Sequence, residues 1–224
     1  MIKNISNLGD AALYCDFGNE INKNINSEVI KFFKTIKEKN IEGITNLTPS
    51  YNKLIVSYDL RVTNFKEIKD KIENLEINEV QEIASKKLEI PVCCDSSFSL
   101  DMRRLEKKLN LSREKILENF FSKEYFCYMT GFIAGMPFLG DLNENMKTQR
   151  LETPRIKVPK GSIGLTEQFA NIYTFESPGG WNIIGNTPLD VFDSSKEKNP
   201  NLINPGDLIT FKQITLDKYK SYNE

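Results

Sequence analysis

Histidine is absent from all 224 residues of the chain. Imidazole is the usual general base near neutral pH and the commonest metal-binding side chain in proteins. Its absence excludes Ser-His and Cys-His nucleophile pairs within this chain, and we predict no metal site. Any acid–base chemistry must use carboxylate, lysine, cysteine or tyrosine, or come from another protein chain.

A surplus of one charge and a long apolar stretch are also missing. Thirty basic residues stand against thirty-one acidic ones, and nucleic-acid binding usually needs a basic surplus. The longest uncharged stretch, Tyr125–Gly140, has 16 residues and includes a proline and three glycines, whereas a membrane helix needs about 20 mostly apolar residues. Met1–Ile5 does not have the build of a signal peptide. We therefore predict no nucleic-acid or membrane partner and expect a cytoplasmic location.

The four cysteines form no C-x-x-C pair, and the adjacent Cys93 and Cys94 have the wrong spacing for a zinc knuckle. In a cytosolic chain we expect reduced, partly buried thiols. No G-x-x-x-x-G-K-[ST] sequence is present, which excludes a P-loop. The glycines of Gly131–Gly140 do not have the spacing of a dinucleotide-binding fingerprint.

The first half of the chain alternates strand and helix patterns. Apolar residues at every second position indicate strands, and apolar residues at helical spacing after a capping residue indicate helices. The predicted elements are strands at 11–17, 44–48, 53–58 and 88–92, and helices from Asn26 or Ser27 to about Lys39 and from Thr63 or Asn64 to Leu75. The order β-α-β-β-α-β is that of a ferredoxin-like domain. We place this domain at residues 1–92 and a second domain at residues 93–224.

The second domain begins with two short helices and continues as an all-β region. Leu100–Phe121 predicts a helical hairpin, with Ser112 as the cap between its helices. A DNA-binding helix-turn-helix is the less favoured alternative, because the second helix has no excess of phosphate-binding residues. From Tyr125 onward short apolar runs alternate with glycine and proline, which is typical of a β-barrel or sandwich. The predicted fold class is α+β.

Four motifs stand out in this region: Gly131–Gly140, Arg150 with Thr153–Ser162, Ser177–Trp181, and Asn204–Asp207. If 155–158 is a strand, Arg155 and Lys157 project from the same face, and Arg150 can join them from its loop. Such a cluster can bind a carboxylate or phosphate. The alternative is a solvated basic edge on a β-strand.

The glycines, prolines and tryptophan of these motifs predict a scaffold around that cluster. Gly131 and Gly135 permit close backbone approaches. Pro178-Gly179 suits the central positions of a type II turn, with Gly180 beside it. Trp181 then packs in the core or lines a pocket.

In this order and spacing the motifs resemble the family that includes the B-type subunit of bacterial 5-oxoprolinase, KipI and subunit 1 of allophanate hydrolase. The resemblance lies in Gly131–Leu139, in 154–164 (Pro-Arg-Ile-Lys-Val-Pro-Lys-Gly-Ser-Ile-Gly) and in Ile172–Trp181, which ends in Ser-Pro-Gly-Gly-Trp. It implies a ferredoxin-like N-terminal domain followed by a cyclophilin-like β-barrel, the carboxyltransferase subdomains C and D.

The same resemblance implies a function in a complex. The expected activity is ATP-dependent opening of 5-oxoproline to glutamate, with ATP belonging to the complex and this chain acting as a non-autonomous component. The expected partners are a homologous C-type subunit, also described as a KipA-type protein, and the A-type subunit of 5-oxoprolinase. Substrate would then bind to Arg150, Arg155, Lys157 and Trp181, on a scaffold of Gly131, Gly135, Pro178, Gly179 and Gly180.

Two alternatives remain open from the sequence. Phe169-Ala170 stands where the family has a polar Gln-Thr pair, and the chain has no histidine. Both features suit a KipI-like regulator that binds and inhibits a sensor histidine kinase without catalytic activity. They also suit a family member that acts only as a structural partner.

Overall fold

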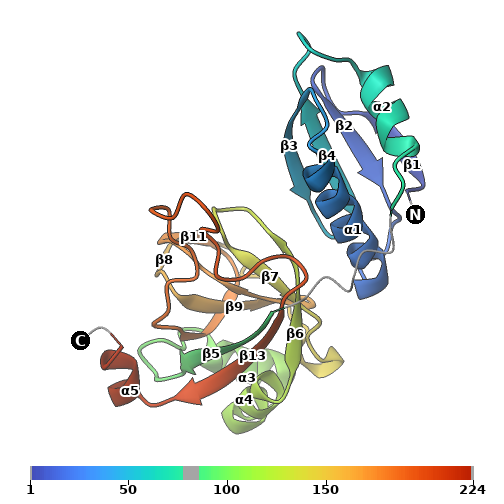
Figure 1. Ribbon diagram of the computed structural model, residues 1–224. Helices are drawn as coiled ribbons and strands as arrows, with labels where there is room; N and C mark the ends of the chain where they lie inside the picture. Colours follow the sequence, from blue (N-terminus) through green and yellow to red (C-terminus); the bar gives the residue numbers. More distant parts are fainter. Residues whose placement is uncertain (1, 78–85, 223–224) are drawn as a thin grey trace. The chain divides into compact units, whose positions relative to one another are not determined.

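The computed structural model describes residues 2–77 and 86–222 and contains two compact units, Met1–Ala84 and Ser85–Glu224. Figure 1 shows a small sheet with two helices in the first unit and a β-barrel in the second. No helix in either described range is long and apolar enough to cross a membrane.

The first unit is a four-stranded antiparallel sheet in the order β1-β2-β4-β3. Its elements are β1 (Asn4–Asn7), β2 (Ala12–Asp16), α1 (Lys23–Lys39), β3 (Ile44–Pro49), β4 (Lys53–Tyr58) and α2 (Phe65–Glu73). Alternate residues of β2 and β4, such as Leu13 and Val56, form one core with Ile36 of α1 and Ile68 of α2. Both helices therefore cover the same face of the sheet.

Helix α1 begins earlier than the sequence predicts. Asn22 is its N-cap and accepts a hydrogen bond from the backbone N–H of Ile25 at 3.0 Å. Asn26, predicted as a cap, lies inside the helix and is fully buried. Its side-chain amide donates to the backbone carbonyls of Ser50 and Tyr51 at 3.0 and 2.8 Å, so it ties α1 to the turn between β3 and β4.

The strand predicted at 88–92 is present as β5 (Lys87–Cys93), but it does not belong to this sheet. It pairs in parallel with β13 (Leu208–Ile214) and touches β12 (Asn182–Asn186), both in the second unit. The extra strand β1 instead flanks β2 at the sheet edge. The predicted closure of the β-α-β-β-α-β pattern is therefore wrong, and the two units divide before β5 rather than at residue 92.

The second unit confirms the predicted β-barrel. Seven strands close in the order β10-β7-β6-β13-β5-β12-β9 (Figure 1). The remaining barrel strands are β6 (Glu124–Thr130), β7 (Pro137–Gly140), β9 (Ser162–Thr166) and β10 (Phe169–Ile172). Outside the barrel lie a two-stranded sheet of β8 (Arg155–Val158) and β11 (Ser177–Gly179), the 3-10 turn η1 (Glu144–Met146) and the terminal helix α5 (Leu216–Lys220).

The predicted helical hairpin is also present and covers the barrel. It consists of α3 (Met102–Leu109) and α4 (Arg113–Phe121), and Ser112 caps α4 by accepting from the N–H of Lys115. Phe120 is fully buried and stacks on Phe211 of β13, with ring centroids 4.7 Å apart. The hairpin therefore packs on the barrel core. This is the favoured interpretation of Leu100–Phe121, rather than a DNA-binding helix-turn-helix.

The motif Asn204–Asp207 has a structural role at the start of the barrel. Asp207 is buried, and its carboxylate accepts from the backbone N–H groups of Lys86 and Asn204 at 3.0 and 2.8 Å. Its carbonyl accepts from the N–H of Cys127 at 2.9 Å. One side chain therefore joins the beginning of β5 to the turn that leads into β13.

We expect Asp207→Ala to lower the free energy of unfolding by about 2–4 kcal/mol, because two charge-assisted hydrogen bonds are lost and two backbone donors stay unpaired. Urea unfolding followed by circular dichroism measures this. Asp190→Ala is the matched control, since Asp190 forms a surface ion pair with Lys160 and such pairs contribute about 0–1 kcal/mol. Equal losses for the two variants would contradict the role assigned to Asp207.

The described titratable groups also predict how stability depends on pH. All four cysteines are free and buried, as predicted, and burial raises the pKa of Cys15 and Cys94 to about 12. The hydrogen bond from Lys53 is the main cause that lowers the pKa of Asp16. Raised thiol pKa values stabilise the fold below the ordinary thiol pKa, and lowered carboxyl pKa values stabilise it above the ordinary carboxyl range.

We therefore expect a level free energy of unfolding between about pH 6 and 8, where histidine would otherwise titrate. It should fall by about 2 kcal/mol or more by pH 10, because the unfolded state then loses thiol protons that the folded state keeps. Urea titrations of the untagged protein across this range test both parts. Unfolding free energies that stay level up to pH 10 would contradict the second part.

Candidate anion-binding site

Arg155 lies in β8, where it was predicted, and is held by a buried carboxylate. Its Nη2 donates to Oδ1 of Asp101 at 2.6 Å, and Asp101 is only 5% exposed. The other oxygen of Asp101 accepts from the backbone N–H of Ile183 at 2.7 Å, and the Asp101 N–H donates to the Ile183 carbonyl at 3.0 Å. Asp101 thus connects the start of α3 with β8 and β12 and orients the guanidinium.

The second terminal nitrogen of the same guanidinium is unused. Arg155 Nη1 is buried and has no hydrogen-bond partner within the described residues. A buried charged donor without a partner is costly, and a guanidinium suits a carboxylate or phosphate. In the neighbouring strand β11, Ser177 Oγ is a second buried polar atom without a partner in the described part of the chain. Arg155 Nη1 and Ser177 Oγ are therefore enclosed polar atoms whose hydrogen-bonding capacity is unused within the described residues.

Tyr173 is a polar group of this site that the sequence reasoning did not select. Its phenol lies against Gly179, where an added Cβ would come 2.1 Å from the hydroxyl oxygen. Burial raises the pKa of Tyr173, while Asn171, the Trp181 backbone and the charges of Arg150 and Arg155 act in the opposite direction. The phenol therefore stays protonated near neutral pH. The sequence feature that could have identified Tyr173 is its position inside the motif Ile172–Trp181.

Arg150 reaches the same region from a loop. A Cβ built on Gly180 would lie 3.5 Å from Arg150 Nε, and the N–H of Leu151 donates to the Gly180 carbonyl at 2.6 Å. The side-chain amide of Asn182 donates to the Gln149 carbonyl at 3.1 Å and so anchors the residue before Arg150. Arg150 is exposed and lies beside Gly180 at the surface of the second unit.

Trp181 is half-buried and forms an apolar wall. It packs edge to face against Phe138 with ring centroids 5.5 Å apart, and both contact the small core of Met136, Val158, Tyr173 and Ile183. Trp181 therefore packs on this core, as one of the two predicted roles requires, and its role in lining a pocket stays a prediction.

Lys157 is placed differently from Arg155. Its ammonium pairs with Glu176 at 2.8 Å, and the two side chains are 73% and 56% exposed. Within the described contacts, it does not reach the group of Arg150, Arg155 and Tyr173. The role of Lys157 in binding stays a prediction.

The predicted scaffold residues fall into two groups. Gly131 and Gly135 lie in the loop between β6 and β7, and Gly135 has φ +71° with Phe192 packed where its side chain would be. Pro178 and Gly179 do not form the predicted turn, because they belong to β11 and pair with β8 across an irregular register. Gly179 and Gly180 are buried, and Gly179 leaves room for the phenol of Tyr173.

The departure at Phe169-Ala170 lies in the barrel wall. Phe169 packs edge to face on Tyr128 with ring centroids 5.7 Å apart, and Ala170 is fully buried in the main core. Neither contacts Arg155 in the described contacts. No group of three histidine, cysteine, aspartate or glutamate side chains that could hold a metal occurs within 2–77 and 86–222.

Comparison with known proteins defines the class to which this fold and site belong. The family model for the carboxyltransferase domain, subdomain C and D, matches residues 3–203. The chain belongs to this family.

Individual relatives support this family assignment. The chain is 33% identical to the B-type subunit of 5-oxoprolinase from Bacillus subtilis (strain 168), over 98% of this chain and 96% of that protein. The crystal structure of TTHA0988 superimposes with a TM-score of 0.82 at 26% identity, over 92% of this chain and 40% of that chain. The Kluyveromyces lactis urea amidolyase shares the fold, with a TM-score of 0.77 at 18% identity over 97% of this chain and 15% of that chain.

The contact between Asp101 and Arg155 can be tested by a double-mutant cycle. We expect Asp101→Ala to lower the free energy of unfolding by about 3 kcal/mol, because it leaves a half-buried guanidinium without its counter-charge. Arg155→Ala should cost less, and the double variant should cost at least about 1 kcal/mol less than the sum of the two.

Urea unfolding of the four proteins measures this coupling. Glu176→Ala is the matched control, because it breaks the exposed pair with Lys157 and should cost at most about 0.5 kcal/mol. Additive effects of Asp101→Ala and Arg155→Ala would contradict the positioning role of Asp101.

Proposed function

We propose that this chain is the B-type subunit of an ATP-dependent 5-oxoprolinase and acts together with a homologous C-type subunit and an A-type subunit. The observation that carries the proposal is the full-length similarity to the B-type subunit of 5-oxoprolinase from Bacillus subtilis. A second B-type subunit, from Haemophilus influenzae, is 31% identical over 93% of this chain and 96% of its own length. The proposed location is the cytoplasm.

The site chemistry supports binding of a small carboxylate. 5-Oxoproline carries one carboxylate and a cyclic amide. In our proposal the carboxylate accepts from Arg155 Nη1 and from Arg150, and the ring lies against Trp181. The phenol of Tyr173 is buried against Gly179 and supports the site from the protein interior. Each interaction would orient the substrate, and charge-assisted bonds are the strongest of them.

The site contains no imidazole to act as a general base, which supports a shared active site. Both oxygens of Asp101 accept hydrogen bonds, the Tyr173 phenol stays protonated, and the chain has no histidine. The proposal therefore assigns proton transfer to another protein of the complex. ATP is proposed to bind elsewhere in the complex, because the chain has no P-loop sequence.

Exposed aromatic side chains near the site suit the pairing with a C-type subunit. Phe132 is 71% exposed and Phe175 is 42% exposed. The backbone of Phe132 is in the left-handed region, with φ +70°. Their two loops are joined by a hydrogen bond from Thr174 Oγ1 to the Ala134 carbonyl at 2.7 Å. Exposed aromatic groups of this kind are typical of protein interfaces.

The test is reconstitution of the chain with the A-type and C-type proteins of its own organism. ATP-dependent release of glutamate from 5-oxoproline is expected, and Arg155→Ala should reduce kcat/KM by at least about ten-fold, as loss of a charge-assisted hydrogen bond implies. Lys160→Ala is the comparison, with an expected change within about two-fold because Lys160 pairs with Asp190 at the surface.

Two results would contradict the proposal. One is an assembled complex of all three proteins without this activity; the other is full activity of the Arg155→Ala complex. The alternative of a KipI-like kinase regulator stays a prediction, and inhibition of sensor-kinase autophosphorylation by the isolated chain tests it.

A further inference from the structure

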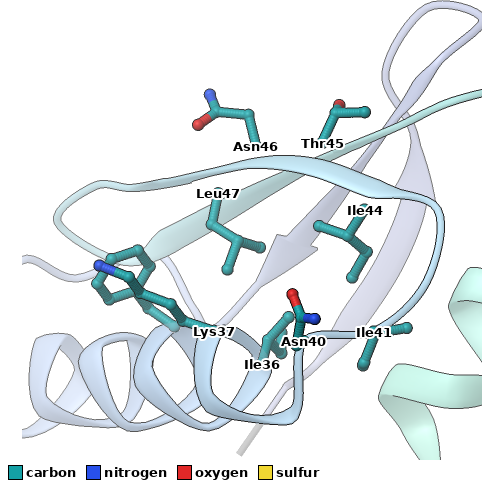
Figure 2. A pocket seen from close by; sticks show the side chains of 9 residues that line it. Ile36, Lys37, Asn40, Ile41, Ile44, Thr45, Asn46 and Leu47 are labelled. Carbon is teal, nitrogen blue, oxygen red and sulfur yellow. The ribbon is translucent and has the colours of Figure 1, made fainter.

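A hollow of about 290 Å³ lies in the first unit, between the C-terminal half of α1 and β3. Figure 2 shows Ile44 and Leu47 pointing from β3 towards the helix, with Ile36 and Ile41 below them and Lys37 at one end. The walls combine apolar and polar residues: Phe33, Ile36, Ile41, Ile44 and Leu47 on one hand, and Lys37, Asn40, Thr45 and Asn46 on the other. Sites for whole small molecules measure about 300–1,000 Å³, so this hollow lies at the lower limit of that range and has room for a large side chain.

The strand beside the hollow is an open edge. β3 is the last strand in the order β1-β2-β4-β3, and only β4 pairs with it in the described residues. The Ser50 N–H donates to the Lys53 carbonyl at 2.8 Å, and Thr48 pairs with Ile55. Bonded pairs alternate along an antiparallel ladder, so Leu47, opposite Val56, directs its N–H and C=O away from β4.

Leu47 therefore serves two purposes, since its side chain lines the hollow while its backbone faces the open edge. A register irregularity between Ile44 and Asn46 and a proline at position 49 bound this stretch. Bulges and prolines stop long edge-to-edge pairing. The part of β3 that can pair with a further strand is Asn46–Thr48. It is long enough for a short added strand and too short for the long edge-to-edge pairing that leads to aggregation.

The charge at the end of the hollow is positive. The Lys37 ammonium lies 5.9 Å from the centroid of the Phe33 ring, and it forms no ion pair with any described carboxylate. It stands exposed in the last turn of α1, near Lys39. A ligand that enters the hollow thus meets a cation that is available for a carboxylate.

We propose that β3 and this hollow form a docking surface for a short extended segment of another protein, which carries one large apolar side chain flanked by acidic residues. The segment adds to β3 through the backbone of Leu47, as in other cases of strand addition. Its apolar side chain fills the hollow and its carboxylate pairs with Lys37. This inference concerns the first unit and does not depend on the proposed enzymatic function.

The probes are two short acetylated and amidated peptides, Thr-Glu-Val-Leu-Val-Glu-Thr and its counterpart with lysine in place of each glutamate. Titration of the ¹⁵N-labelled full chain, followed by amide chemical shifts, measures both affinity and location. The acidic peptide should bind with a Kd of about 1 mM or tighter, shift the amides of 46–48 and 37–41, and slow hydrogen exchange at Leu47. The basic peptide should bind at least about five-fold more weakly, because Lys37 repels it.

Lys37→Glu should reverse this preference, whereas Lys39→Glu, on the same helix but outside the hollow, should leave it within about two-fold. Both side chains are exposed, so neither change threatens the fold. The proposal is overturned if neither peptide binds, if the shifted amides lie outside these two stretches, or if Lys37→Glu and Lys39→Glu alter the preference equally.

Discussion

The parallel pairing of β5 with β13 is the constraint on which the second unit depends. The two strands are in register from Lys87 opposite Leu208 to Cys93 opposite Ile214, and β5 also meets β12 through Cys93. Removing β5 would expose strand edges on both neighbours, and a closed barrel exists to avoid such edges. The register has a chemical anchor, because Asp207 binds the N–H of Lys86 at the start of β5. Since the chain runs from β5 to α3 within a few residues, this register also determines where Asp101 arrives.

Asp101, placed at the start of α3, holds the guanidinium of Arg155 in the candidate anion-binding site. It joins three segments that are far apart in the sequence, and it uses one nitrogen of the Arg155 guanidinium while the other stays unpaired. In a poorly solvated setting a carboxylate orients a guanidinium firmly, and an unused donor there is expensive. A carboxylate or phosphate ligand would relieve that cost, which is why we propose an anion as the ligand of these residues. Gly179 completes the site, since any side chain at Gly179 would displace the phenol of Tyr173.

Sequence reasoning recovered the elements whose signals are local. The alternation at 53–58, the cap at Ser112 and the glycine- and proline-punctuated β region all predicted structures that are present. It did not identify which strands pair or which side chains far apart in the sequence come into contact. Alternation at 88–92 identifies a strand but not its neighbours, so β5 was assigned to the wrong sheet. Asp101 carries no motif, and its partner Arg155 lies 54 residues away. Pro178-Gly179 has the composition of a turn, yet pairing with β8 holds it extended.

The lack of histidine limits the acid–base chemistry of the chain, and the structure shows which groups surround Arg155 instead. Around Arg155 the available groups are cations, a protonated phenol and a carboxylate whose two oxygens are already engaged. These groups can bind and orient an anion, and none of them is an imidazole, the usual general base near neutral pH. A reaction that opens an amide ring needs proton transfer as well as binding. In the proposed function this chain positions the substrate and a partner protein transfers the proton, which agrees with the similarity of the chain to the B-type subunit of 5-oxoprolinase.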